Sequence, residues 1–265
     1  MKNKIFFVFF CLSFLCFSQI IYKYNEKSFV NYSFQIQGNI SFSYPGTQEK
    51  KSKFYSKGVL KIEPVSTENE FYNLKITPIK TMVKVEENVF EDLTNSETGI
   101  SSFISSCMVK MKKNGEIIQV EDTTGGILSL QQILKILPSF PDNITYGKTW
   151  EQKIPGFTIP GIPMCDIKFI YLYEKKNFIK LVGSQVIKEI KKEKDTKIIF
   201  NGKNISNGIF NFNEEEGLIN NFNGNFSIEL YIKFEIPSSP DVKNRKTETI
   251  PMKLNLNLDI QISKI

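Results

Sequence analysis

Histidine is absent from the 265-residue sequence, and this absence removes several classes of functional site at once. Ser-His and Cys-His catalysis, the usual zinc sites and the commonest general base all require the imidazole ring. A serine–lysine nucleophile is also missing, because no serine has a lysine three residues after it. The sequence contains no G-x-G-x-x-G or G-K-[ST] phosphate loop. We therefore predict no enzymatic activity, no catalytic residues and no cofactor.

Motifs for metal binding and acid proteolysis occur only in incomplete form. Asn211, Asn213 and Glu215 have the alternate spacing of calcium-loop oxygens, but Phe222 stands where the acidic twelfth ligand is needed. Residues 122–125 (DTTG) resemble the aspartic-protease turn, yet they include an extra residue and have no second copy. We predict no metal site. The enzymatic alternative that stays open is a carboxylate pair formed by strands far apart in the chain.

Arginine is nearly absent as well, since Arg245 is the only one among 34 basic residues. The lysines are scattered singly along polar segments, whereas a phosphate-binding groove needs clustered cations. Without residues 1–18 the chain has 34 − 2 = 32 basic and 28 acidic residues, a balance of +4. This charge is small and dispersed, so we predict no nucleic-acid partner.

The N-terminal segment predicts export. Residues 1–18 place Lys2 and Lys4 ahead of an apolar run closed by a small residue, Ser18, as in a secretory signal peptide. We therefore expect the protein in the periplasm, at the cell surface or secreted. The run is too short for a membrane span, so we do not expect an integral helical membrane protein. The alternative of lipid anchoring at Cys16 requires small residues where bulky ones stand.

Two of the four cysteines, Cys107 and Cys165, lie beyond the predicted signal peptide. Export would take them to an oxidising compartment, which favours a disulfide between them. A bond closing this loop would stabilise the fold by about 4 kcal/mol in the chain-entropy model. The alternative is that both side chains are separate buried thiols.

Long segments of alternating apolar and polar residues dominate the chain. They run from Leu218 to Ile236, from Val30 to Tyr44 and from Met252 to Ile262. A period of two indicates a strand with one apolar face. The longest segment would span roughly 60 Å, at about 3.3 Å per residue, which a small flat sandwich accommodates badly. We therefore predict a mainly β fold, a large and strongly curved antiparallel sheet or half-open barrel.

One short α-helix is expected against this sheet. Residues 130–137 carry leucine and isoleucine at i, i+3, i+4 and i+7, after a capping box and before Pro138. A helix this short is not stable alone, so its apolar stripe must lie on the sheet. We expect it across the concave face, as a plug or lid.

The chain is expected to form a single β-rich domain over residues 19–265. Two loosely similar halves, about 19–122 and 164–265, are joined by the helix and a proline-rich arm (123–163). No polar low-complexity linker divides the halves, which favours one domain over two.

The middle of the chain carries a motif of proline, glycine and tryptophan. Residues 138–141 (PSFP) precede residues 147–150 (GKTW), and a hairpin rich in glycine and asparagine follows from Gly208 to Gly217. Over roughly residues 105–236 this resembles secreted β-rich bacterial families of unknown function. Long curved strands with a short helix in the hollow are also remotely similar to periplasmic lipoprotein carriers of the LolA and LolB kind. That resemblance implies a half-open barrel sheltering acyl chains, but Arg245 does not match the family's cavity arginine, so no residue role is carried over.

These patterns support three functional interpretations. The first is a non-enzymatic binding scaffold that shelters a lipid or other apolar ligand in the concave sheet, with the helix as a gate. Its ligand-binding candidates are apolar residues expected to face inward: Phe34, Phe42, Leu134, Leu137, Phe222, Phe226 and Ile228. The second is a structural or interaction module of the cell envelope, with a protein partner, in which the same residues form a closed core. The third and least favoured is an outer-membrane β-barrel, because the last strand lacks a terminal aromatic residue.

Overall fold

The computed structural model describes residues 20–86, 106–122, 134–154, 165–237 and 247–265. The predicted signal peptide (1–18) and the anchoring alternative at Cys16 lie outside these residues. The described parts contain the strands β1 (Val30–Ser43), β2 (Lys50–Thr67), β3 (Phe71–Glu86), β4 (Cys107–Lys112), β5 (Ile117–Asp122), β6 (Thr149–Ile154), β7 (Ile167–Lys175), β8 (Phe178–Leu181), β9 (Ser184–Glu193), β10 (Thr196–Asn213), β11 (Leu218–Pro237) and β12 (Thr247–Lys264).

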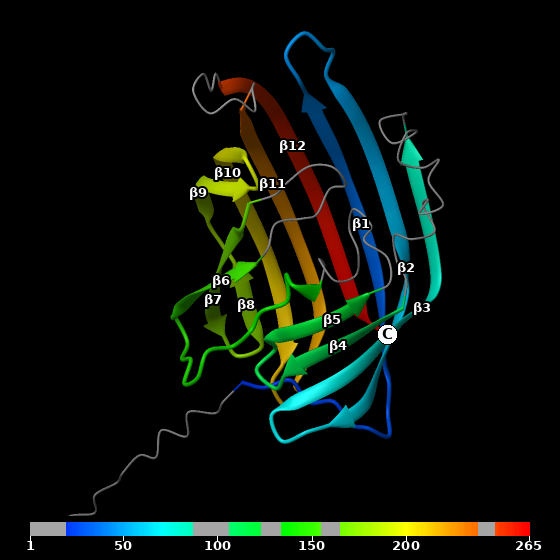
Figure 1. The fold of residues 1–265 in the computed structure, drawn as a ribbon. Helices are drawn as coiled ribbons and strands as arrows, with labels where there is room; N and C mark the ends of the chain where they lie inside the picture. Colours follow the sequence, from blue (N-terminus) through cyan, green and yellow to red (C-terminus); the bar gives the residue numbers. More distant parts are fainter. Residues whose placement is uncertain (1–19, 87–105, 123–133, 155–164, 238–246) are drawn as a thin grey trace, which may run out of the picture.

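All these strands belong to one antiparallel sheet. Its order is β5-β4-β3-β2-β1-β12-β11-β10-β8-β7-β6, and β9 pairs with β10 beside this path. The sheet curls until β4 and β5 lie in front of the long strands, but no ladder among the described residues joins its end strands β5 and β6 (Figure 1). The predicted fold class, a strongly curved antiparallel sheet that does not close, is confirmed.

The two ends of the described chain meet at the centre of the sheet. β1 pairs with β12 along almost its whole length, while β2 to β5 extend the sheet on one side and β11 to β6 on the other (Figure 1). Each half of the chain therefore supplies one side of a continuous sheet.

The long strands are in register with their apolar faces on the same side. Ile262 of β12 lies opposite both Phe34 of β1 and Phe222 of β11. Leu258 likewise lies opposite Phe226, and both side chains are buried. Because side chains alternate across a strand, this register turns three separate apolar stripes toward a common interior. The sequence expectation that these stripes converge is confirmed.

Apolar–polar alternation is interrupted between residues 202 and 207, which predicts two separate strands over 195–202 and 207–212. The structure has one continuous strand here, β10. The expected gap contains Asn204 and Ser206, which point inward and break the apolar alternation. Both are buried, and the Ser206 hydroxyl donates to Asn204 Oδ1 at 2.9 Å. The Asn204 Nδ2 donates in turn to the Lys168 carbonyl at 3.5 Å. Both buried side chains therefore have partners, which allows the strand to continue through an otherwise apolar interior.

The sequence makes two predictions about how prolines affect the strands, and they had different outcomes. The apolar residues of 71–86 change parity at Pro78, which predicts a kink or an edge there. The ladder between β2 and β3 does shift at this point and leaves Ile79 without an opposite residue, but Ile79 is 57% exposed and not on the apolar face as expected. The prolines of the central arm predict a segment without strand pairing, and this is wrong, because the arm contains β6, which pairs with β7. Trp150 of β6 lies opposite Tyr171 and stacks on it, with ring centroids 5.2 Å apart.

Only the end of the predicted helix is described, because residues 130–133 lie outside the described part of the chain. Leu134 is helical, and residues 135–137 form a turn in which the Leu137 amide donates to the Leu134 carbonyl at 3.0 Å. Pro138 follows this turn, where the sequence predicts the end of the helix. Leu134 and Ile136 are nevertheless buried in the same core as the long strands, so the expected side of the sheet is correct.

The packing of Phe34 generates a prediction about Gly58. Gly58 lies opposite Phe34, and a Cβ added to it would lie 2.8 Å from the Phe34 ring and in contact with the Lys80 carbonyl oxygen. Gly58→Ala should therefore lower the free energy of unfolding by about 1–3 kcal/mol, measured by urea unfolding.

Ser56→Ala on the same strand is the matched control. Ser56 also faces inward and is buried, and among the described residues its hydroxyl has no hydrogen-bond partner. Removing it should leave stability within about 1 kcal/mol of wild type or raise it. Equal losses for the two variants would contradict the proposed packing of Phe34 over Gly58.

Candidate functional site

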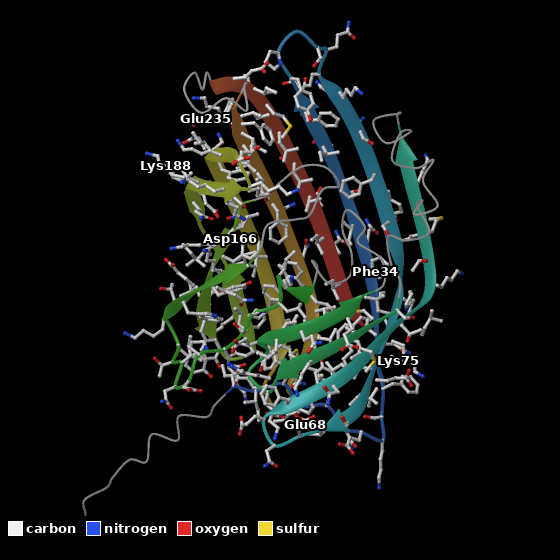
Figure 2. The ribbon with its side chains drawn as sticks, viewed as in Figure 1. Phe34, Glu68, Lys75, Asp166, Lys188 and Glu235 are labelled. Carbon is white, nitrogen blue, oxygen red and sulfur yellow. The ribbon has the colours of Figure 1, made fainter. Side chains whose placement is uncertain are left out.

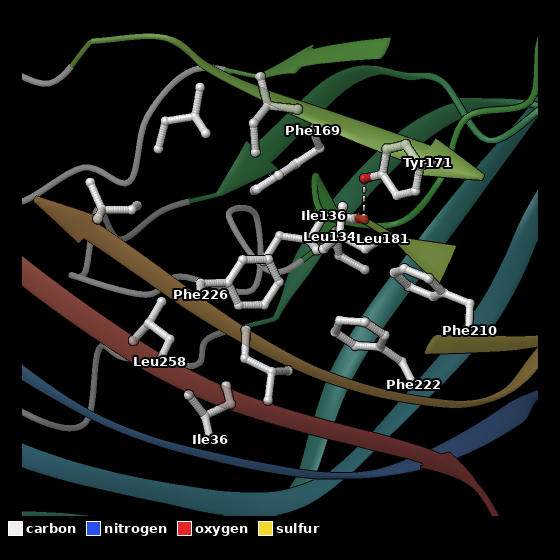
Figure 3. Packing of buried hydrophobic residues seen from close by; sticks show 14 of the residues in the cluster. Ile36, Leu134, Ile136, Phe169, Tyr171, Leu181, Phe210, Phe222, Phe226 and Leu258 are labelled. Carbon is white, nitrogen blue, oxygen red and sulfur yellow. Dashed lines mark hydrogen bonds between the residues drawn. The ribbon is translucent and has the colours of Figure 1, made fainter. Parts of the chain in front are cut away.

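A row of aromatic rings lies along the concave face. Phe210 of β10 stacks on Phe222 of β11, with centroids 4.0 Å apart and planes at 13°. Phe226 meets Phe169 of β7 edge-on at 5.5 Å. Figure 3 shows Phe210 beside Phe222, and Phe169 and Phe226 on separate strands. The first contact joins the paired strands β10 and β11, and the second joins β7 and β11, which are not paired. The interior is therefore apolar and is held in part by ring contacts between unpaired strands.

Residues 134–140, which we call the cover segment, pack on this concave face. The Tyr171 hydroxyl donates to the Ile136 carbonyl at 2.7 Å (Figure 3). The Tyr22 hydroxyl donates to the Pro138 carbonyl at 3.1 Å. Both tyrosines are buried, so each hydroxyl satisfies a carbonyl that would otherwise lack a partner in an apolar environment.

Gln152 of β6 fixes the cover segment from its other side. Its Nε2 donates to the carbonyl oxygens of Lys135 and Leu137, at 3.1 and 3.2 Å. Its Oε1 accepts from the Ser139 amide at 2.9 Å and from the Ser139 hydroxyl at 3.1 Å. One amide side chain thus makes four hydrogen bonds, which is close to its full capacity.

An apolar hollow of about 40 Å³ lies between the cover segment and the sheet. Aliphatic and tyrosine side chains line it: Tyr22, Tyr24, Tyr32, Leu60, Ile62, Leu134, Leu137, Ile219 and Ile262. Ligand pockets commonly measure about 300–1,000 Å³, so the hollow as it stands is too small for a lipid chain. A ligand of that size would have to displace the Leu134 and Leu137 side chains.

The hollow is electrically neutral. None of its lining residues is acidic or basic. Burial, and secondarily the neighbouring tyrosines, raises the pKa of Tyr22 and Tyr24 above the usual range. The pKa of Tyr32 is also raised, mainly by burial. These hydroxyls stay protonated at physiological pH, so the hollow suits an uncharged apolar group and offers nothing to neutralise a charged one.

The predicted site residues gather in one cluster, but only two line the hollow. Buried members are Phe34, Leu134, Phe222, Phe226 and Ile228, and the half-buried Phe42 and Leu137 pack against them. Leu134 and Leu137 border the hollow. The other five are core residues that support the concave face.

The tyrosines of the hollow are the functional candidates that sequence reasoning missed. Tyr22 and Tyr24 precede β1, and Tyr32 was counted only as part of a strand face. A signal was present, because Ile20, Tyr22 and Tyr24 alternate with Ile21 and Lys23 in the pattern that marks the strands. The Tyr72 hydroxyl donates to the Tyr22 carbonyl at 3.1 Å, which secures this segment under the sheet.

The predicted disulfide is not formed, and the alternative of buried thiols is correct. Cys107 begins β4, near one end of the sheet, and Cys165 precedes β7, near the other. Spacing in sequence gives no information on which side of the sheet each cysteine joins. Burial, with a smaller contribution from Glu189, raises the pKa of the Cys165 thiol to about 12.

Metal and membrane features can be stated for the described ranges. These ranges contain no group of three or more Cys, Asp or Glu residues placed to hold a metal ion. Within the same ranges, no helix has the length and apolar character needed to cross a membrane.

Comparison with known proteins finds no family and one weak structural similarity. No protein-family model matches the sequence, and no curated protein matches it significantly. One similar solved structure is that of lipovitellin, studied for its lipid–protein interactions, with 13% identity and a TM-score of 0.47. The match covers 89% of this chain but only 25% of the lipovitellin chain. This similarity is too weak to assign a function, and no match confirms the resemblance to β-rich secreted families or lipoprotein carriers.

The state of the cysteines can be tested by alkylation. The folded protein at pH 8 should resist iodoacetamide at Cys107 and Cys165, because both are buried and alkylation requires an exposed thiolate. After unfolding without reductant, peptide mapping should find both residues labelled. Labelling that requires prior reduction would show a disulfide instead.

The attachment of the cover segment can be tested at Tyr171. Tyr171→Phe leaves the Ile136 carbonyl without its donor, which should lower the free energy of unfolding by about 1–3 kcal/mol. Hydrogen exchange of residues 134–140 should become faster. Tyr231→Phe is the control, because its hydroxyl bonds Glu229 on the exposed face. Unchanged exchange in Tyr171→Phe would show that this bond does not hold the segment.

Proposed function

We propose that this protein is an exported, non-enzymatic scaffold that binds a lipid or another apolar ligand between its concave sheet and the cover segment. The observation that carries the proposal is the neutral apolar hollow at the boundary between these two parts. The lack of histidine in the sequence supports a binding role over a catalytic one.

The way in which the cover segment is attached supports ligand entry at this boundary. Hydrogen bonds from Tyr22, Gln152 and Tyr171 to its backbone hold it on the sheet, and the sheet itself is held by long backbone ladders. Lifting the segment breaks these bonds and the backbone bond from the Phe140 amide to the Asn114 carbonyl (2.7 Å), exposes Ile136 and Phe140, and leaves the ladders between strands intact. Such regions open at a lower free-energy cost than core strands.

Displacing the cover segment would also provide the space that the hollow lacks. Leu134 and Ile136 are buried and Leu137 half-buried, so these side chains occupy apolar surface of the concave face. A ligand chain taking their place would make the same kind of contact, and burial of its apolar surface would favour binding by about 25 cal/mol per Å².

A second function, a structural or interaction module of the cell envelope, is favoured by the closeness of the packing. Residues of the strands on either side of the β1–β12 pair form one buried cluster, and the hollow is small. In this case the concave face is an ordinary core, and no ligand displaces the cover segment.

Leu137→Trp tests the binding proposal. The larger side chain should fill the hollow, so uptake of a fluorescent fatty acid should fall at least tenfold while the protein stays folded. Leu137 is half-buried, which leaves the indole room to adjust. Ile209→Trp is the matched control, because Ile209 is 45% exposed on the outer face of β10. The measurements are fluorescence titration and thermal unfolding.

Two results would count against ligand binding. Absence of saturable uptake by the wild-type protein would favour the structural module. Equal uptake by wild type and a folded Leu137→Trp variant would place any bound fatty acid outside the hollow.

A further inference from the structure

The outer face of β9 combines exposed aliphatic side chains with lysines. Val186 and Ile190 are 73% and 60% exposed, the highest values among the aliphatic side chains within the described strands. Lys188 and Lys192 alternate with them and are also exposed. Figure 2 shows Lys188 projecting outward at the edge of the sheet. Exposed aliphatic groups beside cations are typical of surfaces that meet another phase or partner.

This pattern continues across the neighbouring strands. The register of β9, β10, β11 and β12 places their outward positions in four rows across the strands, which together we call the basic face. The rows run from Val186 to Asn255, from Lys188 to Lys253, from Ile190 to Pro251 and from Lys192 to Thr249. Six of its positions are lysines: Lys188, Lys192, Lys197, Lys203, Lys233 and Lys253. Two are acidic, Glu229 and Glu235, so the face has a net charge of 6 − 2 = +4.

Both acids of the basic face are already neutralised. Glu229 Oε atoms lie 3.2 Å from Lys203 Nζ and 3.1 Å from Lys253 Nζ. Glu235 is bound in the same way by Lys197 and Lys233, at 3.0 and 2.9 Å. Hydrogen bonds from Lys253, and then from Lys203 and Tyr231, lower the Glu229 pKa to about 2.

Lys188 and Lys192 differ from these four lysines. The described residues provide neither of them with an acidic partner. Their charges are therefore available to an external anion.

The face also has a depression beside Tyr231, two strands away from Lys188. This depression of about 470 Å³ is bordered by Tyr231, Lys233 and Lys253, and no acidic residue lines it. Tyr231 is 50% exposed, and Lys253 Nζ lies 5.3 Å from the centre of its ring. An exposed tyrosine beside lysines suits the boundary between apolar chains and anionic headgroups, where amphipathic side chains are favoured.

We propose that the basic face docks the protein on an anionic lipid surface. Val186 and Ile190 enter the headgroup region, and Lys188 and Lys192 contact lipid phosphates from the same strand. A lipid surface fits better than a protein partner because the two aliphatic side chains are separated by lysines. A stable protein interface usually needs a continuous patch of about 800 Å² per partner.

This inference goes beyond the proposed function and does not depend on it. Docking uses outward-facing positions of the strands, whereas the hollow lies on the inward-facing side. A protein with a closed core could dock in the same way. The two proposals can therefore fail separately.

Vesicle sedimentation tests the docking proposal. The purified protein should bind vesicles of phosphatidylcholine with 30% phosphatidylglycerol, should bind pure phosphatidylcholine weakly, and should be released by high salt. Joint Lys188→Gln and Lys192→Gln substitution should weaken binding about 25-fold, because each lysine near an anionic surface contributes about fivefold. Joint Val186→Ser and Ile190→Ser substitution should weaken it at least tenfold.

Joint Lys75→Gln and Lys80→Gln substitution is the matched control. It removes the same charge from exposed positions of β3, on the other side of the sheet, and should leave vesicle binding unchanged. Fatty-acid uptake should be equal in all these variants, which separates docking from the hollow. The proposal is overturned if the wild-type protein does not bind anionic vesicles. It is also overturned if the control variant loses as much binding as the Lys188→Gln and Lys192→Gln variant, or if the double serine variant loses none.

Discussion

The register between β1, β12 and β11 is the constraint on which the rest of the structure depends. It places Ile262 between Phe34 and Phe222 and repeats this arrangement along three long strands. A slip of one residue would turn every one of these side chains toward solvent, so the apolar pattern and the backbone ladder enforce each other. Curling of the sheet around this shared apolar face then creates the interior, and the remaining strands extend it.

The sheet and the cover segment are held in place by different kinds of interaction. Continuous ladders hold the sheet, whereas side-chain donors such as Tyr171 and Gln152 hold the cover segment. The hollow lies at the junction of the two. The same strands also carry side chains on their outer face, because successive residues of a strand point to opposite faces of the sheet. β10 to β12 thus present a mainly apolar surface inward, and β9 to β12 present a basic one outward, as the two proposed interactions require.

Sequence patterns predicted the strands well and the local details less well. Strong alternation located β11 almost to the residue, and Pro78 indicated its ladder irregularity correctly. The break expected within β10 was wrong, because the mutual hydrogen bond of Asn204 and Ser206 has no signature in hydrophobic spacing. For the site, Leu134 and Leu137 were predicted, but the tyrosines opposite them come from segments far away in sequence.

By itself, the sequence determined the mainly β architecture, its long amphipathic strands and the absence of imidazole chemistry, since these follow from period-two patterning and composition. Only the tertiary structure decided which strands are neighbours, that Cys107 and Cys165 are separate thiols, and where the hollow and the basic face lie. The physical reason is that these features depend on contacts between distant segments. Such contacts arise only when the ends of the described chain, β1 and β12, pair at the centre of one sheet.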